Sequence, residues 1–254
     1  LAMLDRKKLG QWQANNAKKA GAMIKTGSKV TSIGKDYVVV SNKEIYFKTL
    51  VGADGVGSIV RNHLGLKNNK IHLTMQYIIQ GNFKELEIHF DSKICKEGYK
   101  WVFPHKGWAS IGIGFDPKRN DIKKVRENFN IWLENKGIDT KKAKFESMPI
   151  LYDYQGFRFG NIFLAGEAAG LTYGLTGEGI YPALASGEEV AKIIIDKNFN
   201  PILIPKILRK KKIQEILITI ITRCSFLGVL LHTLGFWLMK RKKWQSKAIR
   251  LTLS

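Results

Sequence analysis

Two spacings of apolar residues run through the chain, one typical of helices and one typical of strands. Helical spacing predicts helices over residues 5–20, 121–136 and 179–196. Short apolar or alternating runs, bounded by turn residues, predict strands. The predicted strands cover residues 22–33, 37–40, 44–47, 49–53, 71–80, 86–90, 100–103, 109–115, 144–148 and 162–165.

This order of elements predicts a mixed fold, of the α+β or α/β class, in four regions. Residues 1–65 and 151–200 together form one three-layer domain, and residues 66–150 form an antiparallel β-sheet domain inserted between its two parts. Pro201 and Pro205 are expected to break the chain. A helical, basic and apolar C-terminal region, residues 201–254, follows them.

Residues 160–189 carry the chemistry that is easiest to interpret. Glu167 follows a predicted buried strand, and the glycine-rich turn Gly177-Glu178-Gly179 opens a predicted helix. The carboxylate can accept hydrogen bonds from sugar hydroxyls, and free N–H groups at the helix N-terminus favour an electron-rich group. The pattern therefore favours a large phosphorylated cofactor, although an ordinary glycine-rich loop would look similar.

Two further motifs allow the pattern to be compared with a known family. Residues 48–65 contain Asp54-Gly55 followed by Ser58 and Arg61, and residues 99–114 read YKWVFPHKGWASIGIG. Together with the segment around Glu167, they resemble the DG motif, the YxWxFP…GxG signature and the GD motif of geranylgeranyl reductases. This family belongs to the para-hydroxybenzoate hydroxylase-like class of FAD enzymes. The segment DRKKLGQWQANNAKKAGA resembles the family's helix that begins with Asp-Arg.

The resemblance implies an FAD-dependent reductase that transfers hydride from reduced flavin to C=C bonds of geranylgeranyl chains in isoprenoid lipids. It implies a partial FAD-binding domain that contains the inserted sheet. The residues expected to bind FAD are Arg6 near the phosphates, Val30 near the adenine, Asp54, Glu167 at the ribityl hydroxyls, and Gly177, Gly179 and Ile180 at the flavin ring. NAD(P)H or ferredoxin would supply the electrons.

The same resemblance assigns a substrate cavity to the YxWxFP segment. The expected lining residues are Tyr99, Trp101, Phe103, Pro104, Gly112 and Gly114. Read without the family, these aromatic residues could equally fill the core of the sheet. Tyr99 and His105 are weak candidates for the proton donor, and no other catalytic residue can be assigned.

The sequence departs from the family pattern in three places. Glu167 stands where most relatives have aspartate, and Tyr173-Gly174-Leu175 replaces a proline before the glycine turn, which predicts a looser loop. The family's N-terminal GxGxxG fingerprint, which binds the FAD pyrophosphate, is absent. We interpret the chain as an N-terminally truncated family member; a non-catalytic lipid-binding relict is the alternative. An aromatic monooxygenase or halogenase of the same flavin class is a third interpretation.

Charge adds an expectation about partners. The 254 residues carry a formal net charge of +21, and residues 201–254 contain twelve lysines and arginines and one acid. Two basic clusters, at residues 206–212 and 240–243, bracket an apolar stretch, which is typical of an anionic membrane surface and not of a nucleic-acid site. Two distant cysteines indicate a reducing compartment, and the five histidines lack metal-ligand spacing. We expect a cytoplasmic protein, peripheral on the inner face of the cell membrane.

Overall fold

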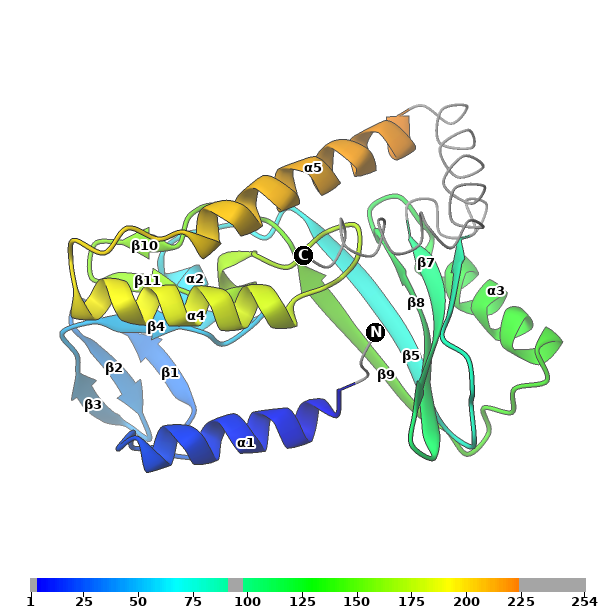
Figure 1. The fold of residues 1–254 in the computed structure, drawn as a ribbon, viewed down its shortest axis with the longest axis horizontal. Coiled ribbons are helices and arrows are strands. Elements are labelled where there is room, and N and C mark those ends of the chain that lie inside the picture. Colours follow the sequence, from blue (N-terminus) through cyan, green and yellow to red (C-terminus); the bar gives the residue numbers. More distant parts are fainter. Residues whose placement is uncertain (1–3, 91–97, 224–254) are drawn as a thin grey trace.

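The computed structural model describes residues 4–90 and 98–223. Figure 1 shows two β-sheet regions side by side, joined along one edge by a long helix. Cys95, Cys224 and the basic cluster at residues 240–243 lie outside the described residues. The α+β character expected from the sequence is confirmed, with five helices, one 3₁₀ turn and eleven strands among the described residues.

The larger sheet is antiparallel and has five strands. Its strands lie in the order β6-β7-β8-β5-β9. They span Glu87–Phe90 (β6), Tyr99–His105 (β7), Trp108–Phe115 (β8), Ile71–Gln80 (β5) and Lys144–Leu151 (β9). The sheet is held mainly by its three long central pairings, of which β5 with β8 and β5 with β9 each run for eight residue pairs.

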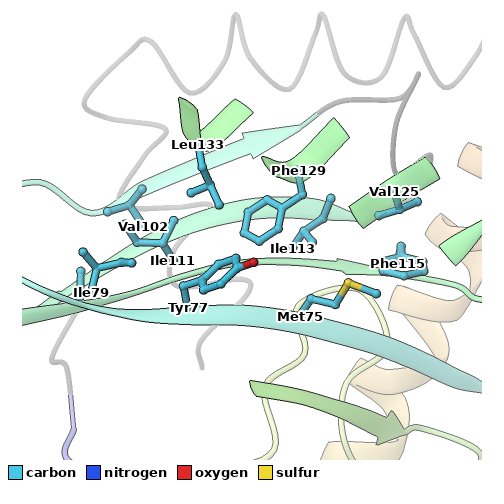
Figure 2. Packing of buried hydrophobic residues seen from close by; sticks show 11 residues of the cluster. Met75, Tyr77, Ile79, Val102, Ile111, Ile113, Phe115, Val125, Phe129 and Leu133 are labelled. Carbon is cyan, nitrogen blue, oxygen red and sulfur yellow. The ribbon is translucent and has the colours of Figure 1, made fainter. Parts of the chain in front are cut away.

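Helix α3 (Ile122–Asn135) covers one face of this sheet, at the right of Figure 1. Asp121 caps the helix by accepting hydrogen bonds from the N–H groups of Lys123 and Lys124. Val125, Phe129 and Leu133 recur at helical spacing and point into the sheet, as Figure 2 shows. They pack against every second residue of β5 and β8, which forms the largest buried core of the protein.

The opposite face of the sheet carries the aromatic residues of the YxWxFP segment. Tyr99, Trp101 and Phe103 alternate with Val102, which belongs to the core beneath α3, so the three aromatic rings lie on the other face. Neighbouring ring centroids are 5.9 and 5.7 Å apart. Pro104 does not share this face, because it pairs with Ala109 of the α3 core. The expectation that it lines the same cavity is therefore wrong.

The second region is built around two parallel strands, β4 (Leu50–Gly52) and β11 (Ile162–Leu164), with β10 (Arg158–Phe159) at the edge. Helix α4 (Ile180–Ile195), helix α2 (Ile59–His63) and a 3₁₀ turn, η1 (Gly166–Ala169), pack around them. A small antiparallel sheet consists of β1 (Val30–Ile33), β2 (Tyr37–Val40) and β3 (Lys43–Tyr46). Helix α1 (Arg6–Lys19) has no buried residue.

The predicted strand over residues 22–33 is too long. Only Val30–Ile33 forms a strand, because Thr26 and Gly27 form a turn in which Gly27 has a φ of +68°. A glycine adopts this left-handed conformation without the steric cost that a Cβ atom brings. The apolar residues at positions 22–24 are exposed and belong to the loop before this turn.

Helix α5 (Leu203–Arg223) includes Pro205, so the predicted break at this residue is wrong. Proline is tolerated in a first helical turn because the N–H it lacks has no partner within the helix. The buried carboxylate of Glu189, on α4, accepts hydrogen bonds from the N–H groups of residues 202, 203 and 204 at 2.6–2.7 Å. Across residues 4–90 and 98–223, no helix combines the length and apolarity needed to cross a bilayer.

We predict that Gly112→Ala destabilises the protein and that Gly114→Ala does not. A Cβ atom on Gly112 would lie 2.6 Å from Trp101 Cε2 and 2.7 Å from the carbonyl oxygen of Met75, whereas one on Gly114 would lie 3.7 Å from its nearest neighbours. Overpacking of this kind costs about 1–3 kcal/mol. Urea unfolding of both variants and the wild type measures the difference. Equal stabilities of the two variants would contradict the packing described here.

Candidate functional site

The carboxyl ends of the two parallel strands define the candidate site. Strands β4 and β11 pair in parallel up to Gly52 and Leu164, and each then enters a short loop. Asp54-Gly55 follows β4, and Gly166-Glu167 follows β11. The two loops face each other: a Cβ atom on Gly55 would lie 3.6 Å from Glu167 Oε2. Ligands of open sheets bind outside the carboxyl ends of parallel strands, so the two acidic motifs meet where a cofactor is expected.

The side chain of Arg61 connects the segments around these loops through hydrogen bonds. Its guanidinium is fully buried and donates to Asn68 Oδ1 at 2.8 Å, to the Ala168 carbonyl at 3.2 Å and to the Asp153 carbonyl at 2.8 Å. A further hydrogen bond of 2.8 Å goes to the carbonyl of Lys67. Ser58 caps the helix that carries Arg61, because Ser58 Oγ accepts a hydrogen bond of 2.9 Å from Arg61 N. Helix α2 and turn η1 are therefore joined through one side chain.

Asp54 and Glu167 both use part of their carboxylate within the protein. Asp54 Oδ2 accepts a hydrogen bond of 2.9 Å from Ile59 N at the start of α2. Glu167 Oε1 accepts one of 3.0 Å from Leu151 N, at the end of β9. Burial raises the pKa of Glu167, while this hydrogen bond and the charge of Arg6 oppose the rise. The extra methylene of glutamate thus lets this residue tie the loop to the five-stranded sheet, a contact that the sequence did not predict.

The glycine turn before α4 is well held. Tyr173 N donates to the Glu178 carbonyl and Gly177 N donates to the Tyr173 carbonyl, both at 2.9 Å. Two backbone hydrogen bonds therefore close the loop without a proline. Helix α4 begins at Ile180 with Gly179 as its N-cap residue, and no side chain of the described residues caps it. Free N–H groups at this end can bind an electron-rich ring edge or an anion.

Tyr99 joins the aromatic face of the sheet to this glycine turn. Its hydroxyl donates a hydrogen bond of 2.6 Å to the carbonyl of Thr176. Burial raises the pKa of the Tyr99 hydroxyl to about 12. His105, the other candidate proton donor, stacks on Trp108 at the far end of β7, with ring centroids 3.7 Å apart. Six residues of strand place it about 20 Å from Tyr99, so the structure does not bring His105 to the glycine turn.

Val30 and Asp54 line one open hollow of about 730 Å³ between β1, β4 and α2. Leu50, Val51, Gly52 and Ala53 of β4 and its following loop contribute to the same surface. Two of the residues expected to bind FAD, Val30 near the adenine and Asp54, therefore share a surface. Arg6 lies at the start of α1, where it is exposed, and its charge acts on Glu167.

Helix α5 contacts the glycine turn and the segments next to it through Lys211 and Gln214. Lys211 is buried, and its Nζ donates to the carbonyls of Tyr152 and Thr172, the latter at 3.0 Å. Gln214 Oε1 accepts a hydrogen bond of 3.2 Å from Leu175 N. Lys211 was expected to belong to a basic cluster available to a membrane, and the structure contradicts this. Its spacing from the apolar residues Ile204 and Ile207, on the same buried stripe, is the signal that could have revealed its place.

Comparison with solved structures identifies the fold. A geranylgeranyl bacteriochlorophyll reductase-like protein from Thermoplasma acidophilum superimposes with a TM-score of 0.65 at 24% identity, over 82% of this chain and 58% of that one. A tryptophan 6-halogenase from Streptomyces toxytricini superimposes with a TM-score of 0.62 at 13% identity, over 82% of this chain and 44% of that one. The fold is thus shared with reductase-like proteins and halogenases.

Sequence comparison finds relatives among the reductases of geranylgeranyl groups. Geranylgeranyl diphosphate reductase of Rhodobacter capsulatus is 30% identical over 213 residues, which are 76% of this chain and 53% of the relative. Digeranylgeranylglycerophospholipid reductase of Methanococcus vannielii is 30% identical over 229 residues, 78% of this chain and 57% of the relative. No family model matches the chain. The chain is a homologue of the geranylgeranyl reductases, which confirms the resemblance, and it spans about half the length of these curated relatives.

Arg61→Met is expected to destabilise the protein by roughly 3–5 kcal/mol, because it leaves the carbonyl groups of Lys67, Asp153 and Ala168 without their donor and removes the positive charge 4.0 Å from the buried Asp153 carboxylate. Arg209→Met is the matched control, since Arg209 is exposed on α5 and a surface change of this kind costs less than about 0.5 kcal/mol. Denaturant unfolding measures both values. A loss below about 1 kcal/mol for Arg61→Met would show that this guanidinium does not hold the loops.

Lys211 predicts a pH dependence of stability. Burial lowers its pKa from 10.5 to about 8, against the charge of Glu215 at 3.2 Å and of Asp153, while the charge of Lys70 adds to the lowering. Between pH 8 and pH 10.5 the unfolded chain holds this proton and the folded chain does not, so the free energy of unfolding rises with pH across that window.

The measurement is urea unfolding at several pH values between 8 and 10 in the wild type, Lys211→Met and Lys212→Met. We expect the Lys211→Met variant to lose this rise, which the wild type and Lys212→Met keep, because Lys212 is exposed. Parallel pH curves for the wild type and Lys211→Met would contradict the lowered pKa.

Proposed function

We propose that this protein is an FAD-dependent oxidoreductase that reduces C=C bonds of geranylgeranyl chains in isoprenoid lipids. The observation that carries the proposal is the hydrogen bond from Tyr99 to Thr176, because it joins an aromatic sheet face to a glycine turn that opens a helix. An apolar chain and a flavin would thereby share one site. The homology to proteins named geranylgeranyl reductases supports this choice of substrate.

The residues present fit a flavin in three respects. Gly177 and Gly179 add no side chain of their own before α4, and the helix begins without a side-chain cap. Glu167 lies between the two loops with one oxygen toward Gly55. Val30 and Asp54 line the hollow suited to the nucleotide half. Bound there, the flavin would supply hydride to one alkene carbon.

The chain's own groups would hold and tune this chemistry. The N–H groups of Gly179 and Ile180 at the start of α4 would stabilise negative charge at the ring edge. The ribityl hydroxyls would donate to Glu167. The Tyr99 hydroxyl keeps its proton and donates a hydrogen bond to the Thr176 carbonyl. Tyr99 would therefore hold the glycine turn in place and form part of the cavity wall. Trp101 and Phe103 would line the path of the prenyl chain.

A monooxygenase or halogenase function is the second candidate, and the shared fold with a halogenase is its support. Fold alone does not fix chemistry. The sequence relatives favour reduction, and so does the row of three aromatic rings along β7, which suits a long apolar chain better than a small aromatic substrate.

We also propose that the protein associates peripherally with the inner face of the cell membrane. Lys206, Arg209, Ile213 and Ile216 recur at helical spacing along the exposed side of α5, opposite its buried stripe. A face of mixed basic and apolar residues favours an anionic lipid surface. The electron donor, NAD(P)H or ferredoxin, remains part of the proposal.

The test is reduction of a digeranylgeranyl glycerophospholipid by the purified protein in detergent, with added FAD and a chemical reductant under anaerobic conditions. We expect product masses that rise in whole H₂ steps, because each reduced bond gains one hydride and one proton. Bound and reducible FAD with no change in lipid mass would contradict the proposal. Supplying oxygen and aromatic substrates would then test the second candidate.

The role of Glu167 is tested by measuring the FAD affinity of Glu167→Gln, with Glu188→Gln as the control. Glutamine keeps an acceptor for Leu151 N but removes the charge, whose hydrogen bonds to hydroxyls contribute about 1.5–3 kcal/mol. We expect FAD binding at least about tenfold weaker for Glu167→Gln. Glu188 is exposed and pairs with Lys192, so its variant should bind FAD like the wild type. Equal FAD affinity of both variants would contradict the role of Glu167.

A further inference from the structure

A row of hydrogen bonds crosses the aromatic face of the five-stranded sheet. Trp101 Nε1 donates to Ser110 Oγ at 3.0 Å, and Ser110 Oγ donates to Gln76 Oε1 at 2.7 Å. Gln76 Nε2 then donates to Glu146 Oε2 at 2.8 Å. The four side chains come from β7, β8, β5 and β9, one from each strand. We name this set, Trp101, Ser110, Gln76 and Glu146, the polar row.

In the polar row, the hydrogen bond that each side chain makes fixes the orientation of the side chain next to it. The indole N–H is a single donor, so Ser110 alone satisfies it. Because the hydroxyl of Ser110 donates its proton to Gln76, a lone pair of Ser110 Oγ is left to accept the hydrogen bond from Trp101. The amide of Gln76 is in turn oriented by Glu146, whose carboxylate also pairs with Lys144 at 2.7 Å. The network is buried at Trp101 and Ser110 and partly exposed at Gln76 and Glu146, and connected hydrogen bonds of this kind favour one orientation of each member.

The indole plane is also fixed by what lies beneath it. Residues 101 and 112 are directly opposite in the pairing of β7 with β8, and a Cβ atom on Gly112 would overlap the indole. Trp101 therefore lies flat over the glycine. Tyr99 on one side and Phe103 on the other complete the row of rings, and Tyr99 contacts the glycine turn.

We propose that Ser110 and Gln76 are positioning residues that hold the Trp101 indole in one plane, and that Trp101 so held sets the length of prenyl chain that the cavity prefers. The inference rests on the proposed function. Tyr99 contacts the glycine turn, Trp101 is its neighbour and Phe103 lies beyond, so a prenyl chain bound along this row from the turn would need its length to contact all three rings. Releasing the indole removes the flat wall that a long chain needs.

The first readout concerns the indole alone. The protein contains six tryptophans, so labelling with 5-fluorotryptophan gives a small set of ¹⁹F signals, of which Trp101→Phe identifies one. We expect Ser110→Ala and Gln76→Met to shift or split the Trp101 signal. The control is Ser147→Ala in the same sheet. Ser147 Oγ donates to the Thr74 carbonyl at 2.9 Å, and residue 147 pairs with Met75 on the α3 face.

The second readout is binding of geranylgeraniol against geraniol, which requires no turnover. The wild type should prefer the longer alcohol, and Ser110→Ala should lose at least threefold of that preference while Ser147→Ala keeps it. An unchanged Trp101 signal in Ser110→Ala would overturn the positioning role. An unchanged affinity ratio, or binding of neither alcohol, would overturn the specificity role.

The two proposals fail in different ways. If the wild type reduces no lipid but prefers geranylgeraniol, and the preference falls in Ser110→Ala, the reductase function is wrong and the polar row still positions Trp101 for a prenyl ligand. If the wild type reduces lipid but the alcohol preference is the same in wild type and Ser110→Ala, the inference about the polar row is wrong and the reductase function stands.

Discussion

The arrangement of the site depends on one buried guanidinium. Arg61 cannot be deprotonated in a protein, so its burial requires acceptors on several sides. The chain supplies carbonyl oxygens from Lys67, Asp153 and Ala168, three segments that are distant in sequence. Because these acceptors must converge on a planar group, the loop after β11 and the segment after β9 have fixed positions relative to α2. The two acidic motifs face each other as a consequence.

A second set of contacts links the sheet that would bind the lipid to the turn that would bind the flavin. Tyr99 reaches Thr176 from β7, and Glu167 reaches Leu151 at the end of β9. Lys211 of α5 binds both Tyr152 and Thr172, so it bridges the same two parts from the outside. Three independent contacts on different sides restrict rotation between them. Hydride transfer requires such a fixed geometry between the two reactants.

The sequence predicted the elements whose periodicity is strong. Helix α3 and its core follow from Val125 and Phe129 at helical spacing, and the long strands of the five-stranded sheet follow from their apolar alternation. Motif resemblance indicated Asp54, Glu167 and the glycine turn. Face assignment failed at Pro104, because a strand reverses side at each residue and the motif was treated as one surface.

The residues that sequence reading missed are polar groups with long-range partners. Glu189 caps α5, a helix thirteen residues further on, and Lys211 lies inside although it stands between the charged residues Lys210 and Lys212. Composition places such residues on the surface, since a buried charge is costly. The carbonyl groups of Tyr152 and Thr172, together with the carboxylate of Glu215, offset that cost, and the two carbonyl groups are too distant in sequence to be predicted from a local pattern.

The spacing of the YxWxFP…GxG motif has a geometric reason in this fold. Two glycines in β8 would weaken a strand if they stood alone, because they contribute no side chain to packing. Gly112 instead makes room for the indole of Trp101, its direct partner across the pairing, and Gly114 lies opposite Tyr99. The tryptophan therefore requires the first glycine. The second glycine is not required in the same way, because a Cβ atom there would lie 3.7 Å from Thr74 Cγ2 and Trp101 Cζ3, which is ordinary contact. Because the requirement at Gly112 follows from the strand pairing, a larger residue at this position of β8 should displace Trp101 on β7 and lower the stability of the sheet.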